Sequence, residues 1–172
     1  MATEGRGEED RGFEAFGRRY RSERAAIVSF IDKVRAAEKN GGEAFAAWAE
    51  VCRTEPIRIA LRMIAEREAY HSRVFQRRLA ELGGEERATT TEEGRKFRDV
   101  LAAPQLADEE KLAYFTNYVG KPEDAVRDIR DLAALIRDDV GTKEALKLFA
   151  DDELSTAQWL WHQCAELPAR RP

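Results

Sequence analysis

Residues 57–82 read IRIALRMIAEREAYHSRVFQRRLAEL, and the spacing of the inward side chains in this stretch decides the fold class. They recur at alternating steps of four and three, which places them on one face of an α-helix. The stripe consists of Ile57, Leu61, Ile64, Glu68, His71, Phe75, Leu79 and Leu82. Thr54 offers an N-cap and Pro56 suits the first turn. Gly83 and Gly84 stop the helix, so one long amphipathic helix is predicted between residues 54 and 83.

Helical periodicity also covers the rest of the chain. It predicts helices over 13–39 and 43–53, short helical segments near 92–102 and 108–118, and further main helices over 122–139 and 142–166. Gly41 and Gly42 cost a helix interior about 2 kcal/mol together. The stripe nevertheless keeps its phase across them, from Glu38 to Phe45, which favours a single long helix, kinked or straight. The prediction is therefore all-α: an antiparallel four-helix bundle with short helices in its middle connection.

Composition supports this class and excludes others. The 172 residues are 36% charged and 43% hydrophobic with five Pro, which fits one domain of amphipathic helices, predicted over 13–167. The net charge is −4 with both signs interspersed, so no nucleic-acid surface is expected. No apolar stretch reaches the ~20 residues of a membrane span. Residues 1–12 are polar and Gly-rich, which predicts a disordered tail and no secretory signal. Cys52 and Cys164 show no CxxC spacing, so a cytoplasmic location is expected.

The informative feature is a set of polar residues at positions that should face the core. Glu68 and His71 occupy successive inward positions of one helix, Glu38 interrupts the preceding stripe, and Glu153 interrupts the last one. A carboxylate left alone in a core costs several kcal/mol or takes up a proton. A Glu-x-x-His pair at i, i+3 directs two ligands at one point, as in carboxylate-bridged metal bundles.

The positions of these residues relative to the helix connections place them at one level. Glu38 lies about sixteen residues before the predicted turn at 54–55, and Glu68 lies about fourteen after it. Glu153 is a similar distance past the turn at Val140-Gly141. Antiparallel packing would therefore bring Glu38, Glu68, His71 and Glu153 into one layer, which makes them the candidate metal ligands.

The segment from Glu38 through Glu68-Ala69-Tyr70-His71 resembles the first half of ferritin-like, rubrerythrin-type domains. In that family a helix Glu and a partner-helix Glu-x-x-His supply half of a di-iron site, and a second helix pair supplies the other half. The resemblance covers roughly residues 30–164 and is weaker in the second half. It implies a bound iron, one ion or two, and iron-dependent redox or iron-handling activity, with Glu38, Glu68, His71 and Glu153 as ligands.

The second half departs from the family pattern at two positions. Thr156 stands where the second His is expected, and an alignment of the two halves places Ala125 where the third-helix Glu is expected. Thr is a poor iron ligand compared with His. A complete di-iron site is therefore in doubt, and a single metal, an asymmetric site or no metal remain as alternatives.

Two function classes follow from these residues. The first is a ferritin-like metalloprotein with the activity of an iron oxidoreductase. The second is a non-catalytic helical bundle that has lost the metal site and serves as an interaction or scaffold protein. A ligand pocket between the helices is a third reading that no residue singles out. Aromatic residues on two faces of the segment Trp159-Leu160-Trp161 indicate a second contact surface, which predicts a homodimer in either case, with burial inside the single chain as the alternative.

Overall fold

The computed structural model describes residues 12–166, and its secondary structure is helical apart from one short hairpin. The elements are β1 (Phe13–Ala15), β2 (Arg18–Tyr20), α1 (Glu23–Val51), α2 (Glu55–Glu81), α3 (Glu92–Ala102), α4 (Asp108–Val119), α5 (Pro122–Ala125), α6 (Arg127–Leu135) and α7 (Val140–Glu166). The predicted all-α class is confirmed. The tail predicted over residues 1–12 lies outside the described residues, except for Gly12.

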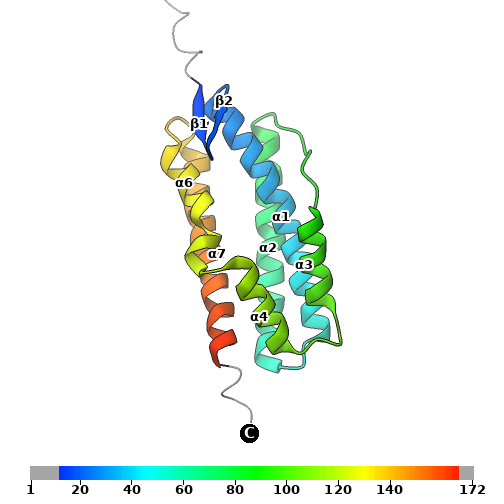
Figure 1. The fold of residues 1–172 in the computed structure, drawn as a ribbon. Helices are drawn as coiled ribbons and strands as arrows, with labels where there is room; N and C mark the ends of the chain where they lie inside the picture. The colour runs from blue at the N-terminus through cyan, green and yellow to red at the C-terminus, as the bar shows by residue number, and fades with distance from the viewer. Residues whose placement is uncertain (1–11, 167–172) are drawn as a thin grey trace, which may run out of the picture.

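Three long helices form the frame of the molecule. α1 and α2 run antiparallel side by side, and α3 packs on the outer side of α1 (Figure 1). α7 lies across from them, and the short helices α4, α5 and α6 follow one another along it. The segment between α3 and α7 thus forms three short helices and not one long helix.

The first predicted helix begins later than expected, because residues 13–20 form a hairpin. Phe13 pairs with Tyr20 and Ala15 with Arg18, across a turn in which Phe16 and Gly17 both have positive φ, 54° and 66°. Two such residues are typical of the tight turns that match strand twist. The Phe16 ring stacks on Phe30 of α1 at a centroid distance of 5.2 Å, which stabilises an otherwise costly conformation. The prediction of helix over 13–20 was wrong.

Gly41 and Gly42 neither break nor end α1, which is continuous from Glu23 to Val51. A Cβ on Gly42 would lie 3.1 Å from the Ala65 carbonyl oxygen of α2, and a Cβ on Gly41 would lie 2.9 Å from Glu68 Oε2. The glycines therefore allow α1 and α2 to approach closely beside Glu68. This contact offsets their low helix propensity.

The predicted helix over 122–139 is interrupted and ends early. It is divided at Val126, where ψ is 0°, and it stops at Leu135. The Glu23 carboxylate of α1 accepts hydrogen bonds from the backbone N–H groups of residues 137–139. These groups therefore do not donate to helix carbonyls, and the helix does not continue through them. Asp139 then accepts the N–H of Thr142 and begins α7. The apolar residues of this segment are nevertheless buried: Val126, Ile129, Leu132, Ala133 and Ile136.

The hydrophobic core is divided into two clusters. One contains Phe45, Trp48, Leu61, Phe97, Leu112 and Leu160, and the other contains Ile27, Ile31, Phe75, Leu79, Leu132 and Phe149. In α1, α2 and α7 the residues between the two clusters include the polar positions predicted from the sequence. A layer of polar side chains therefore separates two apolar ends of the bundle.

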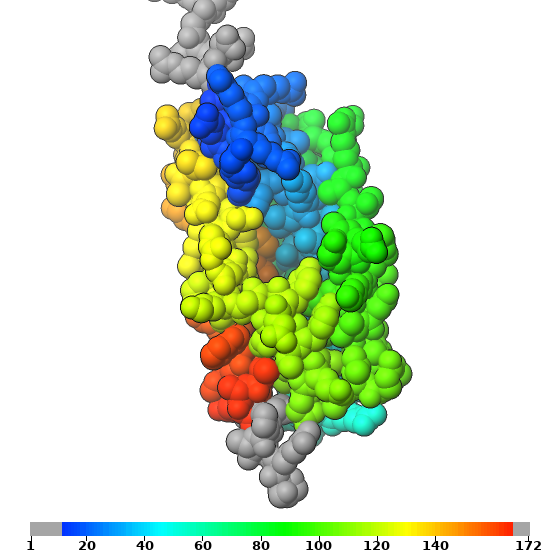
Figure 2. Space-filling view, viewed as in Figure 1, coloured from blue at the N-terminus to red at the C-terminus, as the bar shows by residue number. Residues whose placement is uncertain are grey.

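The hairpin covers the end of the bundle between α1 and α6, and the face below it is hollowed, with part of α7 visible at the floor (Figure 2). A cavity of about 380 Å³ is lined there by the hairpin, by α1 and by Asp128 of α6. No helix within residues 12–166 has an apolar stretch of the length that a bilayer requires.

Candidate metal centre

Three helices bring ligand-type side chains together in the polar layer. α1 supplies Glu38, α2 supplies Glu68 and His71, and α7 supplies Glu153. The first three are buried, at 7%, 4% and 5% exposure, and Glu153 is partly buried. One ligand atom each of Glu38, His71 and Glu153 lies within 4.8 Å of the others. Glu68 lies against Glu38 in the same layer.

The His71 ring is held between acids on both sides. Its Nδ1 lies 3.3 Å from Glu38 Oε2 and 3.4 Å from Glu153 Oε1. Burial alone would lower the pKa of His71, but hydrogen bonds to Glu153 and to Asp152 raise this pKa above its usual value. A ring with a proton on each nitrogen would donate to the acids on both sides. A metal ion at Nδ1 would replace one of those protons.

Asp152 completes this arrangement and was missed by the sequence analysis. Its Oδ2 lies 3.1 Å from His71 Nε2, and its side chain is 49% exposed. An Nε2–H that donates to Asp152 leaves the Nδ1 lone pair directed at Glu38 and Glu153. Metal-binding histidines commonly donate their second N–H to a carboxylate in this way. The only sequence signal was its position immediately before Glu153.

The carboxyl groups of Glu38 and Glu68 are adjacent and buried, which is an unfavourable place for two negative charges. Burial, together with the charge of Glu153, raises the pKa of Glu38 well above its usual value. Burial, then the charges of Glu38 and Glu153, do the same to the pKa of Glu68. Glu68 Oε1 is buried and accepts no hydrogen bond, and the buried Glu153 Oε1 has only the His71 ring nitrogen, at 3.4 Å. Two carboxylates cannot donate to each other, so a proton or another cation must lie between them.

A sixth side chain, Arg67, places a cation at the edge of the layer. Its Nη2 donates to Thr156 Oγ1, and its Nε is buried with no acceptor. Its charge also opposes the rise in the pKa of Glu38. Thr156 is buried at 5% exposure, at the position where the sequence comparison expected a second His. That position is therefore taken by a guanidinium contact.

The short helices α5 and α6 add no ligand to the layer. Ala125, which aligns with an expected Glu, is exposed, and so are its acidic neighbours Glu123, Asp124 and Asp128. Asp124 is already paired with Arg127. The break at Val126 explains this, because it turns the acidic end of the segment away from the core.

The donor set fits one transition-metal ion. Ligand atoms ~2.1 Å from a tetrahedral metal are separated by roughly 3.4 Å, which matches the 3.3 Å and 3.4 Å around Nδ1. One imidazole and several carboxylates suit iron, manganese or zinc. The buried Glu68 Oε1 accepts no hydrogen bond and is therefore free to bind a cation. No second cluster of metal-ligating side chains occurs in residues 12–166.

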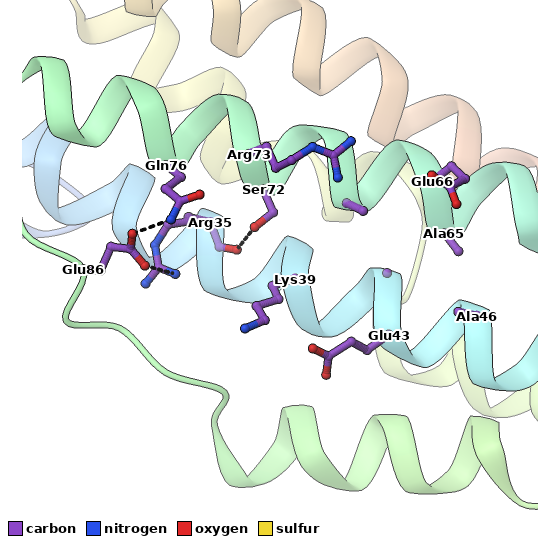
Figure 3. Close-up of a pocket in the computed structure, with 12 residues that line it drawn as sticks. Arg35, Lys39, Glu43, Ala46, Ala65, Glu66, Ser72, Arg73, Gln76 and Glu86 are labelled. Atoms are coloured by element: carbon purple, nitrogen blue, oxygen red, sulfur yellow. Dashed lines mark hydrogen bonds and ion pairs between the residues drawn. The ribbon is translucent and has the colours of Figure 1, made fainter.

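A separate groove of about 470 Å³ lies over the seam between α1 and α2 (Figure 3). Small residues such as Gly42, Ala46 and Ala65 form its floor, and charges of both signs surround it. Its charged residues are partly paired with one another, as in the contact of Arg35 with Glu86. None of the metal-centre side chains lines this groove, so it is a different surface.

No protein-family model matches the chain, and neither a curated protein nor a solved structure matches it.

Proposed function

We propose that this chain is a metalloprotein of ferritin-like architecture that binds one transition-metal ion, with iron as the first candidate, through Glu38, Glu68, His71 and Glu153. One observation carries the proposal: Glu68 is 4% exposed and has an oxygen that no donor reaches. A group of that kind is costly in a core unless it binds a cation or a proton. Beside it, Glu38, His71 and Glu153 offer ligand atoms within 4.8 Å of one another, which favours a metal.

Bound iron would supply one-electron redox chemistry in a largely buried site. In this role Glu38, Glu153 and Glu68 would provide carboxylate oxygens and His71 would provide Nδ1, oriented by Asp152 at 3.1 Å from Nε2. The half-exposed Asp152 lies on the solvent side of the layer and would define the approach for a small oxidant. An activity in peroxide removal or iron handling is consistent with this arrangement.

Elemental analysis of protein purified without chelators tests the proposal. We expect a stoichiometric amount of metal in the wild type and a loss of most of it in His71→Ala. The matched control is His162→Ala, because His162 is the other histidine of the chain and lies on the surface paired with Glu166. Equal metal content in His71→Ala and the wild type would refute the assignment.

A second function, as an interaction protein, is favoured by the exposed apolar side chains of α2. Ile59, Met63 and Tyr70 are 54%, 71% and 57% exposed and are spaced by four and seven residues, so they share one helix face. Such a face suits a second copy of the chain, in keeping with the predicted homodimer. Sedimentation equilibrium alongside metal analysis separates the two functions, since a dimer without metal would support the second alone.

A further inference from the structure

The geometry points to Arg67 as a built-in cation of the metal centre, which occupies the Thr156 side of the polar layer and limits the site to a single divalent ion. This inference rests on the proposed function and specifies its stoichiometry. The reasons are the number of acids in the layer, the placement of Arg67 and the chemistry of the side chain that it contacts.

The layer contains more acids than one ion requires. Glu38, Glu68, Asp152 and Glu153 carry four negative charges when ionised, against two positive charges from one divalent ion. Glu68 Oε1 is buried with no hydrogen-bond donor, and Glu153 Oε1 has only the His71 ring nitrogen, 3.4 Å away. Acids in this excess could bind a second ion unless another cation were already present.

Arg67 is that cation. It precedes Glu68 on α2 and crosses to α7, where it donates to Thr156, three residues after Glu153. It is held there without a carboxylate partner of its own, and its Nε is buried with no acceptor. By contrast, Arg35 one turn from Glu38 is fully engaged by Asp32 and Glu86. Arg67 is therefore the cation available to balance the layer.

One metal ion, together with Arg67, is enough to balance the negative charges of the layer. One divalent ion and Arg67 together supply three positive charges against four acids, and Asp152 is half exposed and screened by solvent. A second divalent ion would lie beside a guanidinium and would lack a nitrogen ligand, since His71 is the only histidine in the layer. Like charges at such short range in a buried site are strongly unfavourable.

Cobalt(II) uptake by the full chain tests the inference, with stoichiometry from titration calorimetry and coordination from the visible spectrum. We expect a single ion in the wild type and also in Thr156→His, because Arg67 still blocks the second position. We expect the double variant Arg67→Met/Thr156→His to take up a second ion. Arg67→Lys/Thr156→His, which keeps the charge, should return to a single ion.

The control is Arg62→Met/Thr156→His, since Arg62 is an exposed arginine of the same helix. Thermal melts of every variant establish that it is folded. A second ion in Thr156→His alone, or a single ion in a folded Arg67→Met/Thr156→His protein, would overturn the role of Arg67. A wild type that takes up no cobalt would instead remove the proposed function, and this inference with it.

Discussion

Asp108 and Glu68 are both buried carboxylates, yet their surroundings are opposite. Asp108 is 5% exposed and accepts four hydrogen bonds, from Trp48 Nε1, from the backbone N–H groups of Arg53 and Thr54, and from the Thr54 hydroxyl. Burial alone would raise the pKa of Asp108, but these hydrogen bonds hold this pKa below its usual value. Glu68 is equally buried, has an oxygen with no donor, and has a raised pKa.

The difference separates a structural acid from a functional one. Asp108 joins the start of α4 to the turn between α1 and α2, and its charge is fully compensated by the fold. The charge of Glu68 is compensated only in part, by the nearby His71, and its Oε1 accepts no hydrogen bond, so the remaining compensation has to come from a bound cation or a proton. The contrast predicts that removal of Asp108 damages the fold, whereas removal of Glu68 damages binding.

The largest expected effect is that of Asp108→Ala. It leaves the buried Trp48 N–H and the N–H groups of the turn without acceptors, and it removes a negative charge that acts on the buried Lys111. We expect the free energy of unfolding to fall by about 3–5 kcal/mol, as for other broken buried charge networks. Urea denaturation measures this, with the exposed Asp99→Ala as control. A loss comparable to that of the control would remove the distinction between the two acids.

Glu68→Gln should have the opposite effect on the metal-free protein. The native state keeps a proton on this group above its usual pKa of 4.5, whereas the unfolded state releases it, so Glu68 lowers stability as the pH rises. The amide cannot ionise, and we expect the metal-free variant to be more stable than the wild type by about 1–3 kcal/mol at pH 8 and equal to it near pH 4. Metal binding should be lost.

Thermal melts of metal-free protein between pH 4 and pH 8 check the sign of this effect. Glu66→Gln is the matched control, since Glu66 is exposed two positions away. Asp108 acts in the reverse direction, because its lowered pKa stabilises the fold above the usual value of 3.8 and that contribution is lost as the pH falls below it. A destabilised Glu68→Gln protein at pH 8 would mean that Glu68 is a structural acid after all.

The smallest expected effect is that of Asp152→Asn, which tests whether Asp152 orients His71 for metal binding. The amide still reaches His71 but no longer favours the tautomer with a proton on Nε2. Because Asp152 is half exposed, we expect metal affinity to fall by about tenfold, the lower end for residues that orient a metal-binding histidine. Titration calorimetry against Asp151→Asn, an exposed neighbour paired with Arg130, provides the measurement and the control.

Much of this architecture could be predicted from the sequence because burial follows helical spacing. In α2 the stripe from Ile57 to Leu79 is buried as predicted, and the helix ends before Gly83. The short helices predicted over 92–102 and 108–118 are also confirmed, as α3 and α4. The polar residues on the stripes stood out because they broke an otherwise apolar pattern.

The parts that the sequence did not predict depend on contacts between distant segments. The helix predicted over 122–139 ends early because Glu23, more than a hundred residues away, accepts backbone N–H groups just beyond Leu135. No local sequence signal marks that boundary. Arg67 and Asp152 lie at the border of the inward face of their helices. A charged residue at such a position cannot be distinguished by sequence pattern from a solvent-exposed one. Only the packing of α2 against α7 gives those two residues a place in the centre.

The division of the core into two apolar clusters bears on how cooperatively the molecule unfolds. Each cluster draws on its own short helices, α3 and α4 for one and α6 for the other, and only the three long helices are common to both. With the layer between them empty of metal, the two ends have little side-chain packing to couple them, and one end could open while the other stays folded. An ion that ties α1, α2 and α7 together at the midpoint would make the transition a single event, so metal content should be visible in the steepness of the melt as well as in its midpoint.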